Sequence, residues 1–188
     1  MNLLFSFTLL SCLYLNGCSA TSSAPGPSVN PTESPKVGAS QDSSQGRAVF
    51  EPVLTELKQK TRVPLRLPTY LATEEETNPL YAIIETATVR RYVLQLAFTK
   101  TCGGGTACRY GMVSGQAVEG RARREKGRAV SLAHGITGYF VDAQCGANCS
   151  DSTLTWVQDG YRYTVGIKAE KVETLIKVAN SAIESKLR

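Results

Sequence analysis

The sequence predicts an α+β fold, a mostly antiparallel sheet of about six to eight short strands with an N-terminal helix and a C-terminal helix packed on it. Three observations lead to this expectation. Short β-rich runs follow one another over residues 80–165, runs with helical spacing lie on both sides of them, and an Asp-Gly pair separates the last two strands. A short antiparallel sheet with one apolar face needs a cover, and amphipathic helices supply one.

The chain opens with a short apolar leader. The run from Leu3 to Leu15 suits a signal peptide and is too short for a membrane-spanning helix, which needs about 20 apolar residues. The tetrapeptide that ends at Cys18, Leu-Asn-Gly-Cys, resembles a bacterial lipobox. That resemblance implies cleavage after residue 17 and acylation of Cys18 by several chains such as palmitate, because one chain holds a protein only marginally at a membrane. The alternatives are an ordinary cleaved signal peptide in which Cys18 has no role, or a cut near Ala20.

Residues 18–49 are predicted to form a disordered tether. They are rich in Ser, Thr, Pro, Gly and Ala, and such a segment buries too little apolar surface to offset the entropy of ordering it. Residues 50–188 remain and fit a single globular α+β domain.

The domain is expected to start with a helix from Phe50, with Pro52 in its first turn, and to continue as an extended segment over Val63–Pro68. The two clearest early strands are Leu80–Ala87 and Tyr92–Phe98, the second of which alternates apolar and polar residues. The later strand candidates are Tyr110–Ser114, Gln116–Arg121, Ala129–Leu132, Ile136–Ala143, Leu154–Val157 and Tyr161–Val165.

Two signals define the end of the domain. Asp159-Gly160 lies between the last two strand candidates, and Asp-Gly between β-rich runs is among the strongest short hairpin signals. An apolar stripe from Val172 to Leu187 then predicts a helix that covers the sheet.

The four cysteines of the domain predict disulfides, because an even number in an exported domain usually pairs. The favoured pairs are Cys102–Cys108 and Cys145–Cys149, since each brackets a loop that contains turn residues. Cross-linking of the two loops is left open. Zinc is a weaker alternative, because usual zinc sites have tighter Cys-x2-Cys spacing. No metal and no cofactor are expected.

A basic patch lies in the middle of the chain. Between residues 87 and 128 there are nine basic and two acidic side chains, a net charge of +7, against +5 for the whole chain. The densest part is expected to be a loop or hairpin tip, with Arg121, Arg123, Arg124, Lys126 and Arg128 as its basic side chains. It is either a solvated turn that protects strand edges or a surface that attracts lipid headgroups, wall polymers or an acidic protein. Nucleic acid is not expected as a partner.

No catalytic residue is predicted. His134 is the one histidine, and nothing in the sequence links it to a nucleophile or an acid. The glycine-rich run after Cys102 lacks the Gly-Lys-Ser/Thr of a phosphate-binding loop. An enzyme would need clustered ionisable groups in a cleft.

The order of elements from Leu154 resembles the end of uncharacterised exported domains of bacteria, several of them lipoproteins: a tryptophan, a short turn with glycine, an aromatic strand, and a helix that contains Ala179-Asn180-Ser181. The glycine-rich cysteine segment is similar to hypothetical lipoproteins of cyanobacteria. The resemblance implies a fold and a compartment, and it carries no catalytic residue.

We therefore expect an envelope lipoprotein, anchored at Cys18 to the outer membrane or to the periplasmic face if the cell is Gram-negative. Its role is expected to be binding or structural and not enzymatic. The alternatives are a hydrolase of cell-wall or lipid substrates and an accessory or sensor subunit that docks through the basic loop.

Overall fold

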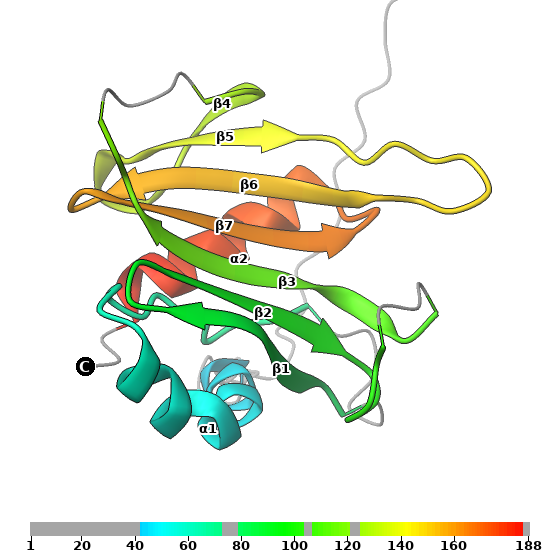
Figure 1. Ribbon diagram of the computed structural model, residues 1–188. Helices are drawn as coiled ribbons and strands as arrows, with labels where there is room; N and C mark the ends of the chain where they lie inside the picture. The colour runs from blue at the N-terminus through cyan, green and yellow to red at the C-terminus, as the bar shows by residue number, and fades with distance from the viewer. Residues whose placement is uncertain (1–41, 73–78, 104–106, 121–124, 186–188) are drawn as a thin grey trace, which may run out of the picture. The chain divides into compact units, whose positions relative to one another are not determined.

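Seven antiparallel strands form one sheet in the part of the chain that the computed structural model describes, residues 42–72, 79–103, 107–120 and 125–185 (Figure 1). Across the sheet the strand order is β1-β2-β3-β7-β6-β5-β4. The bounds are β1 Tyr81–Thr88, β2 Arg91–Ala97, β3 Arg109–Ala117, β4 Arg128–Ser131, β5 Thr137–Val141, β6 Asp151–Gln158 and β7 Tyr161–Lys168. Two α-helices pack on this sheet, α1 (Asp42–Lys60) and α2 (Val172–Glu184), so the predicted α+β class is confirmed.

The two helices lie at different places on the sheet. In Figure 1, α1 lies beside β1 at one edge, whereas α2 lies behind β6 and β7. The buried side chains of α2 are Leu175, Val178, Ala179, Ala182 and Ile183, most of which belong to the predicted apolar stripe. Neither helix in the described ranges is both long and apolar enough to cross a membrane.

The hairpin between β6 and β7 forms at Asp159-Gly160, as the sequence predicts. Both residues have positive φ, 53° and 80°, which is the backbone of the two-residue turns that match strand twist. The turn places Trp156 directly opposite Tyr163, and their rings stack with centroids 5.6 Å apart.

Two elements differ from the prediction. The helix α1 begins at Asp42 and not at Phe50, so Pro52 lies inside it and not in its first turn. Within the additional turns, Gly46 packs so closely on the backbone of Thr69 that a Cβ atom would lie 2.3 Å from the carbonyl oxygen. The other difference is β3, one strand where the sequence predicts Tyr110–Ser114 and a second strand from Gln116.

One face of the sheet, which we name the core face, is covered by α2 and by the proline-bounded segment 61–72. Three tyrosine hydroxyls hold that segment. Tyr92 accepts a hydrogen bond from the Arg66 N–H at 3.3 Å, Tyr163 donates to the Pro64 carbonyl at 3.1 Å, and Tyr110 donates to the Ala72 carbonyl at 2.5 Å. Burial raises the pKa of all three phenols, that of Tyr163 to about 12.

Arg66 joins the segment to the end of α2. Its Nη1 donates to the carbonyl oxygens of Ile183 and Ser185, each at 3.0 Å. The last carbonyls of a helix have no partner within the helix, and a guanidinium there satisfies them and complements the helix dipole. This contact fixes the C-terminal helix to a residue more than a hundred positions earlier in the chain.

The opposite face of the sheet, which we name the open face, is turned toward the viewer in Figure 1, and α2 does not cover it. Its side chains alternate with those of the core face along each strand. On β6, for example, Leu154 and Trp156 are fully buried on the core face, whereas Thr153 and Thr155 are half-buried on the open face.

Candidate anion-binding site

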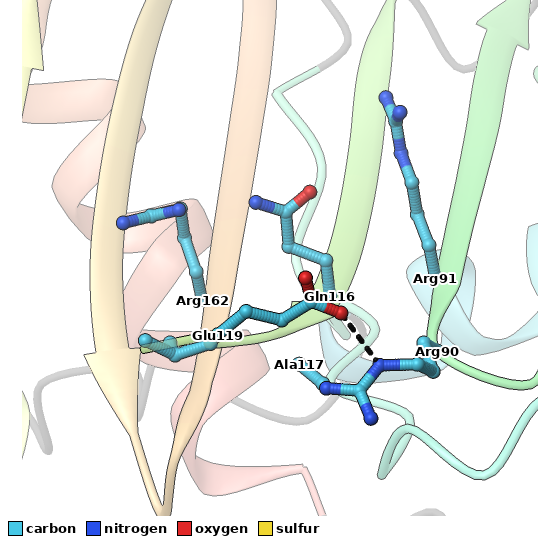
Figure 2. Close-up of a pocket in the computed structure, with 7 residues that line it drawn as sticks. Arg90, Arg91, Gln116, Ala117, Glu119 and Arg162 are labelled. Carbon is cyan, nitrogen blue, oxygen red and sulfur yellow. Dashed lines mark ion pairs between the residues drawn. The ribbon is translucent and has the colours of Figure 1, made fainter. Parts of the chain in front are cut away.

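Three polar side chains form a row on the open face near one end of the sheet. Arg91 of β2 lies opposite Gln116 of β3, and Gln116 lies opposite Arg162 of β7. Neighbouring strands are about 4.8 Å apart, so the two arginine Cα atoms lie about 10 Å from each other. Figure 2 shows the two guanidinium groups on either side of Gln116.

These three residues line a cleft of about 390 Å³, together with Arg90, Ala117, Val118 and Glu119. Arg90 belongs to the turn between β1 and β2, and Glu119 follows β3 (Figure 2). The volume lies within the range of ordinary small-ligand sites. Three arginines and one glutamate therefore line a space large enough for an anionic group.

The two glutamates of the region differ in how firmly they are held. Glu119 pairs with Nε of Arg90 at 2.9 Å, but both side chains are more than half exposed, so this pair contributes at most about 1 kcal/mol. Glu125 accepts from Nε of Arg162 at 2.6 Å, and both of these side chains are mostly buried. Glu125 contacts the Nε and Nη2 groups of Arg162, so Nη1 can still donate to a ligand.

Arg91 differs from its neighbours. It is exposed, and no acidic side chain pairs with it anywhere in the described ranges. Gln116 beside it adds an amide that can donate or accept. Guanidinium groups bind carboxylate and phosphate through two parallel N–H donors, so this arrangement is suited to an anion.

The basic patch predicted from the sequence lies only partly in the described chain. Arg121, Arg123 and Arg124 fall outside the described residues. Lys126 and Arg128 are exposed, and the Arg128 guanidinium lies 5.5 Å from the centroid of the Phe140 ring. Glu125, from the same stretch, forms the ion pair with Arg162 and so places the end of this stretch beside the cleft.

Sequence reasoning missed Arg162 as a site residue. The sequence places it in a strand between two tyrosines, far from Arg90 and Arg91. Only the register of β2, β3 and β7 brings the three arginines to one cleft. The local excess of positive charge from residue 87 onward was the signal that pointed to this region.

The four cysteines of the domain form two disulfides, Cys102–Cys108 and Cys145–Cys149, the same pairs that the loop residues favour. Disulfides persist in oxidising compartments, so these two indicate an extracellular or periplasmic location. Cys102 is buried and accepts a hydrogen bond from Gln95 of β2 at 3.3 Å. Cys18, the predicted lipidation site, lies outside the described residues.

His134 lies in a short 3-10 turn, Ala133–Gly135, with φ of 57°. It is exposed and does not line the arginine cleft. Within the described ranges no three His, Cys, Asp or Glu side chains come together as a metal site would require.

A second cleft, of about 500 Å³, lies between α1 and β1. It is lined mainly by apolar side chains, with Lys100 as its one basic residue: Ala48, Val49, Pro52, Leu80, Tyr81, Ala82, Ile83 and Lys100. Lys100 lies 5.6 Å from the centroid of the Tyr81 ring, so its charge already has an aromatic neighbour. The arginine cleft is the more charged of the two.

The interpretation of the site depends on its own chemistry. In comparisons with known proteins, no family model, no curated protein and no solved structure matches this chain.

Proposed function

We propose that the protein is a lipid-anchored envelope protein that binds an anionic component of the envelope through the arginine cleft and has no catalytic role. The single observation that carries the binding role is the row of Arg91, Gln116 and Arg162 beside Arg90 in one open cleft. Basic residues concentrated in a cleft raise the local concentration of anions and orient them.

The exposed position of Arg91 also supports binding over a structural role. An arginine that stabilises a fold is held by carbonyl or carboxylate partners, as Arg66 and Arg109 are. Arg109 forms two hydrogen bonds with Asp151, at 2.7 and 2.6 Å, and Asp151 is largely buried. Arg91 has no such partner in the described ranges, so its charge is available to a ligand.

The anchor rests on the leader and on the compartment. Leu15-Asn16-Gly17-Cys18 resembles a lipobox, and the two disulfides agree with a location outside the cytoplasm. Cys18→Ser is expected to move the protein from the membrane fraction to the soluble fraction and to remove the mass of the acyl chains, measured by fractionation and intact-mass spectrometry. Retention in the membrane at unchanged mass would contradict the anchor.

Binding at the cleft is tested with inorganic phosphate as the probe. Titration of the full chain, followed by backbone NMR, is expected to shift the amide signals of Arg90, Arg91, Gln116 and Arg162. Arg91→Gln is expected to weaken binding about tenfold, since it removes a charged donor pair whose loss costs about 1.4 kcal/mol.

Arg47→Gln is the matched control, because Arg47 is an exposed arginine on α1 away from the cleft. It removes the same charge from the protein and is expected to leave the affinity for phosphate unchanged. Equal weakening by the two variants would show that phosphate responds to net charge only, and the proposed cleft would then be rejected.

A further inference from the structure

We propose that the open face beside the arginine cleft binds a polysaccharide whose sugars carry carboxylate groups, with one carboxylate in the cleft and the neighbouring sugars along the sheet. The inference rests on the proposed function, since the anion occupies the same cleft, and it adds the class of ligand. It is carried by a second row of side chains, parallel to the row of Arg91, Gln116 and Arg162.

This second row, which we name the hydroxyl row, crosses four neighbouring strands. Ser114 of β3 lies opposite Thr164 of β7, Thr164 opposite Thr155 of β6, and Thr155 opposite Tyr139 of β5. At about 4.8 Å between strands, the four Cα positions span about 14 Å. Four consecutive strands thus present a hydroxyl at the same level of the sheet.

The hydroxyl row adjoins the cleft. Ser114 and Thr164 lie two residues along their strands from Gln116 and Arg162, and residues two apart share one face of a sheet about 7 Å from each other. A ligand whose anionic group occupies the cleft would therefore have its next groups over Ser114 and Thr164. In Figure 1, no helix lies in front of β3 and β7.

The hydroxyls are available for hydrogen bonds. Thr155 and Thr164 share one bond, with 2.9 Å between their Oγ1 atoms, and each hydroxyl has further capacity as donor or acceptor. The side chains of Ser114 and Tyr139 have no hydrogen-bond partner in the described part of the chain, and all four side chains are half-buried. Each can exchange its water for the hydroxyl of a sugar.

The same face is a poor match for a lipid or for the core of a protein interface. Protein interfaces centre on aromatic and aliphatic anchors, and lipid insertion needs large exposed apolar groups. In the described ranges, the exposed large hydrophobic residues of this face are two valines, Val141 and Val157. The valine methyl groups and the Tyr139 ring provide small apolar areas for the C–H faces of sugars, between the hydroxyls that bind their OH groups.

Three probes separate the cleft from the hydroxyl row: galacturonate, tetragalacturonate and a neutral galactose tetramer, each titrated into the full chain. The tetragalacturonate is expected to bind at least about tenfold tighter than the monomer. Its four equivalent carboxylates alone would raise the apparent affinity only about fourfold, by statistics. The neutral tetramer is expected to bind more weakly than the tetragalacturonate, because it lacks the group for the cleft.

Two conservative variants test the hydroxyl row. Thr155→Val and Tyr139→Phe keep the shape of each side chain and are expected to weaken tetragalacturonate binding about threefold or more while monomer binding stays unchanged. Thr174→Val is the control, because Thr174 belongs to α2 and this helix packs on the core face. It is expected to change neither the affinity for tetragalacturonate nor the affinity for galacturonate.

The outcomes distinguish this inference from the proposed function. If the tetramer binds no tighter than the monomer, or if both row variants leave its affinity unchanged, the polysaccharide is ruled out while the anion site stands. If neither galacturonate nor phosphate binds at the cleft, the proposed function itself fails.

Discussion

The same types of side chain have different roles on the two faces of the sheet. On the core face, the hydroxyls of Tyr92, Tyr110 and Tyr163 each bond to the backbone of segment 61–72. On the open face, the hydroxyl of Tyr139 has no partner in the described ranges. The strand register decides on which face of the sheet a tyrosine lies. Its hydroxyl therefore either stabilises the fold or is available to bind a ligand.

The arginines on the two faces also differ in whether protein groups hold their side chains. Arg66 lies under the core face and is fixed by two carbonyl oxygens at the C-terminal end of α2, whereas Arg91 lies on the open face without an ion partner in the described ranges. Polar groups that are satisfied within the protein contribute to stability, and groups that still face water can bind a ligand. The comparison thus separates residues that hold the fold from residues that we propose to bind.

The largest expected effect is a loss of stability in alkali that depends on the core-face tyrosines. Burial raises the pKa of Tyr163 from 10.0 to about 12 and raises those of Tyr92 and Tyr110 as well. Between pH 10 and about 12 the unfolded chain releases phenolic protons that the folded chain retains. The stabilisation is therefore complete below pH 10 and decreases as the pH rises through about 12, by a few kcal/mol in total.

Denaturant unfolding at a series of pH values measures this loss. Tyr163→Phe is expected to reduce the dependence of the unfolding free energy on pH, because it removes one of the buried phenols. The expectation would be contradicted if the wild type kept its full stability to pH 12, or if Tyr163→Phe left the dependence unchanged.

A smaller effect is expected when single hydroxyls are removed near neutral pH. Tyr92→Phe leaves the Arg66 N–H without its acceptor and is expected to cost about 1–2 kcal/mol of unfolding free energy. Tyr139→Phe removes a hydroxyl that faces water and is expected to change stability by less than about 0.5 kcal/mol. Urea titrations of the two variants measure these changes in the unfolding free energy. Equal losses would contradict the proposed difference between the core face and the open face.

Much of the fold could be predicted because its signals are local. Asp159-Gly160 determines a two-residue hairpin, and the apolar spacing of α2 is visible within its own residues. The start of α1 could not be found in this way. Its first turns pack on Thr69 through Gly46, a contact with a distant segment that composition does not reveal.

The site was less predictable for the same reason. The excess of positive charge in the middle of the chain led to the right region, but Arg162 joins Arg90 and Arg91 only through the pairing of β3 with β2 and β7. Cross-strand register depends on contacts between segments far apart in sequence. The hydroxyl row is hidden in the same way, since Ser114 and Tyr139 belong to strands that are not neighbours in the chain or the sheet.

The bond between Arg66 and the last turn of α2 has a consequence for the making of the protein. Several hydrogen-bond partners of segment 61–72 are residues synthesised much later, up to Ser185 at the far end of the described chain. Folds that depend on such distant contacts form slowly, because the loop between them must close first. We therefore expect that the nascent chain cannot complete this packing until its C-terminal helix has emerged, so that a polypeptide destined for an extracellular or periplasmic location remains unfolded long enough to cross a membrane.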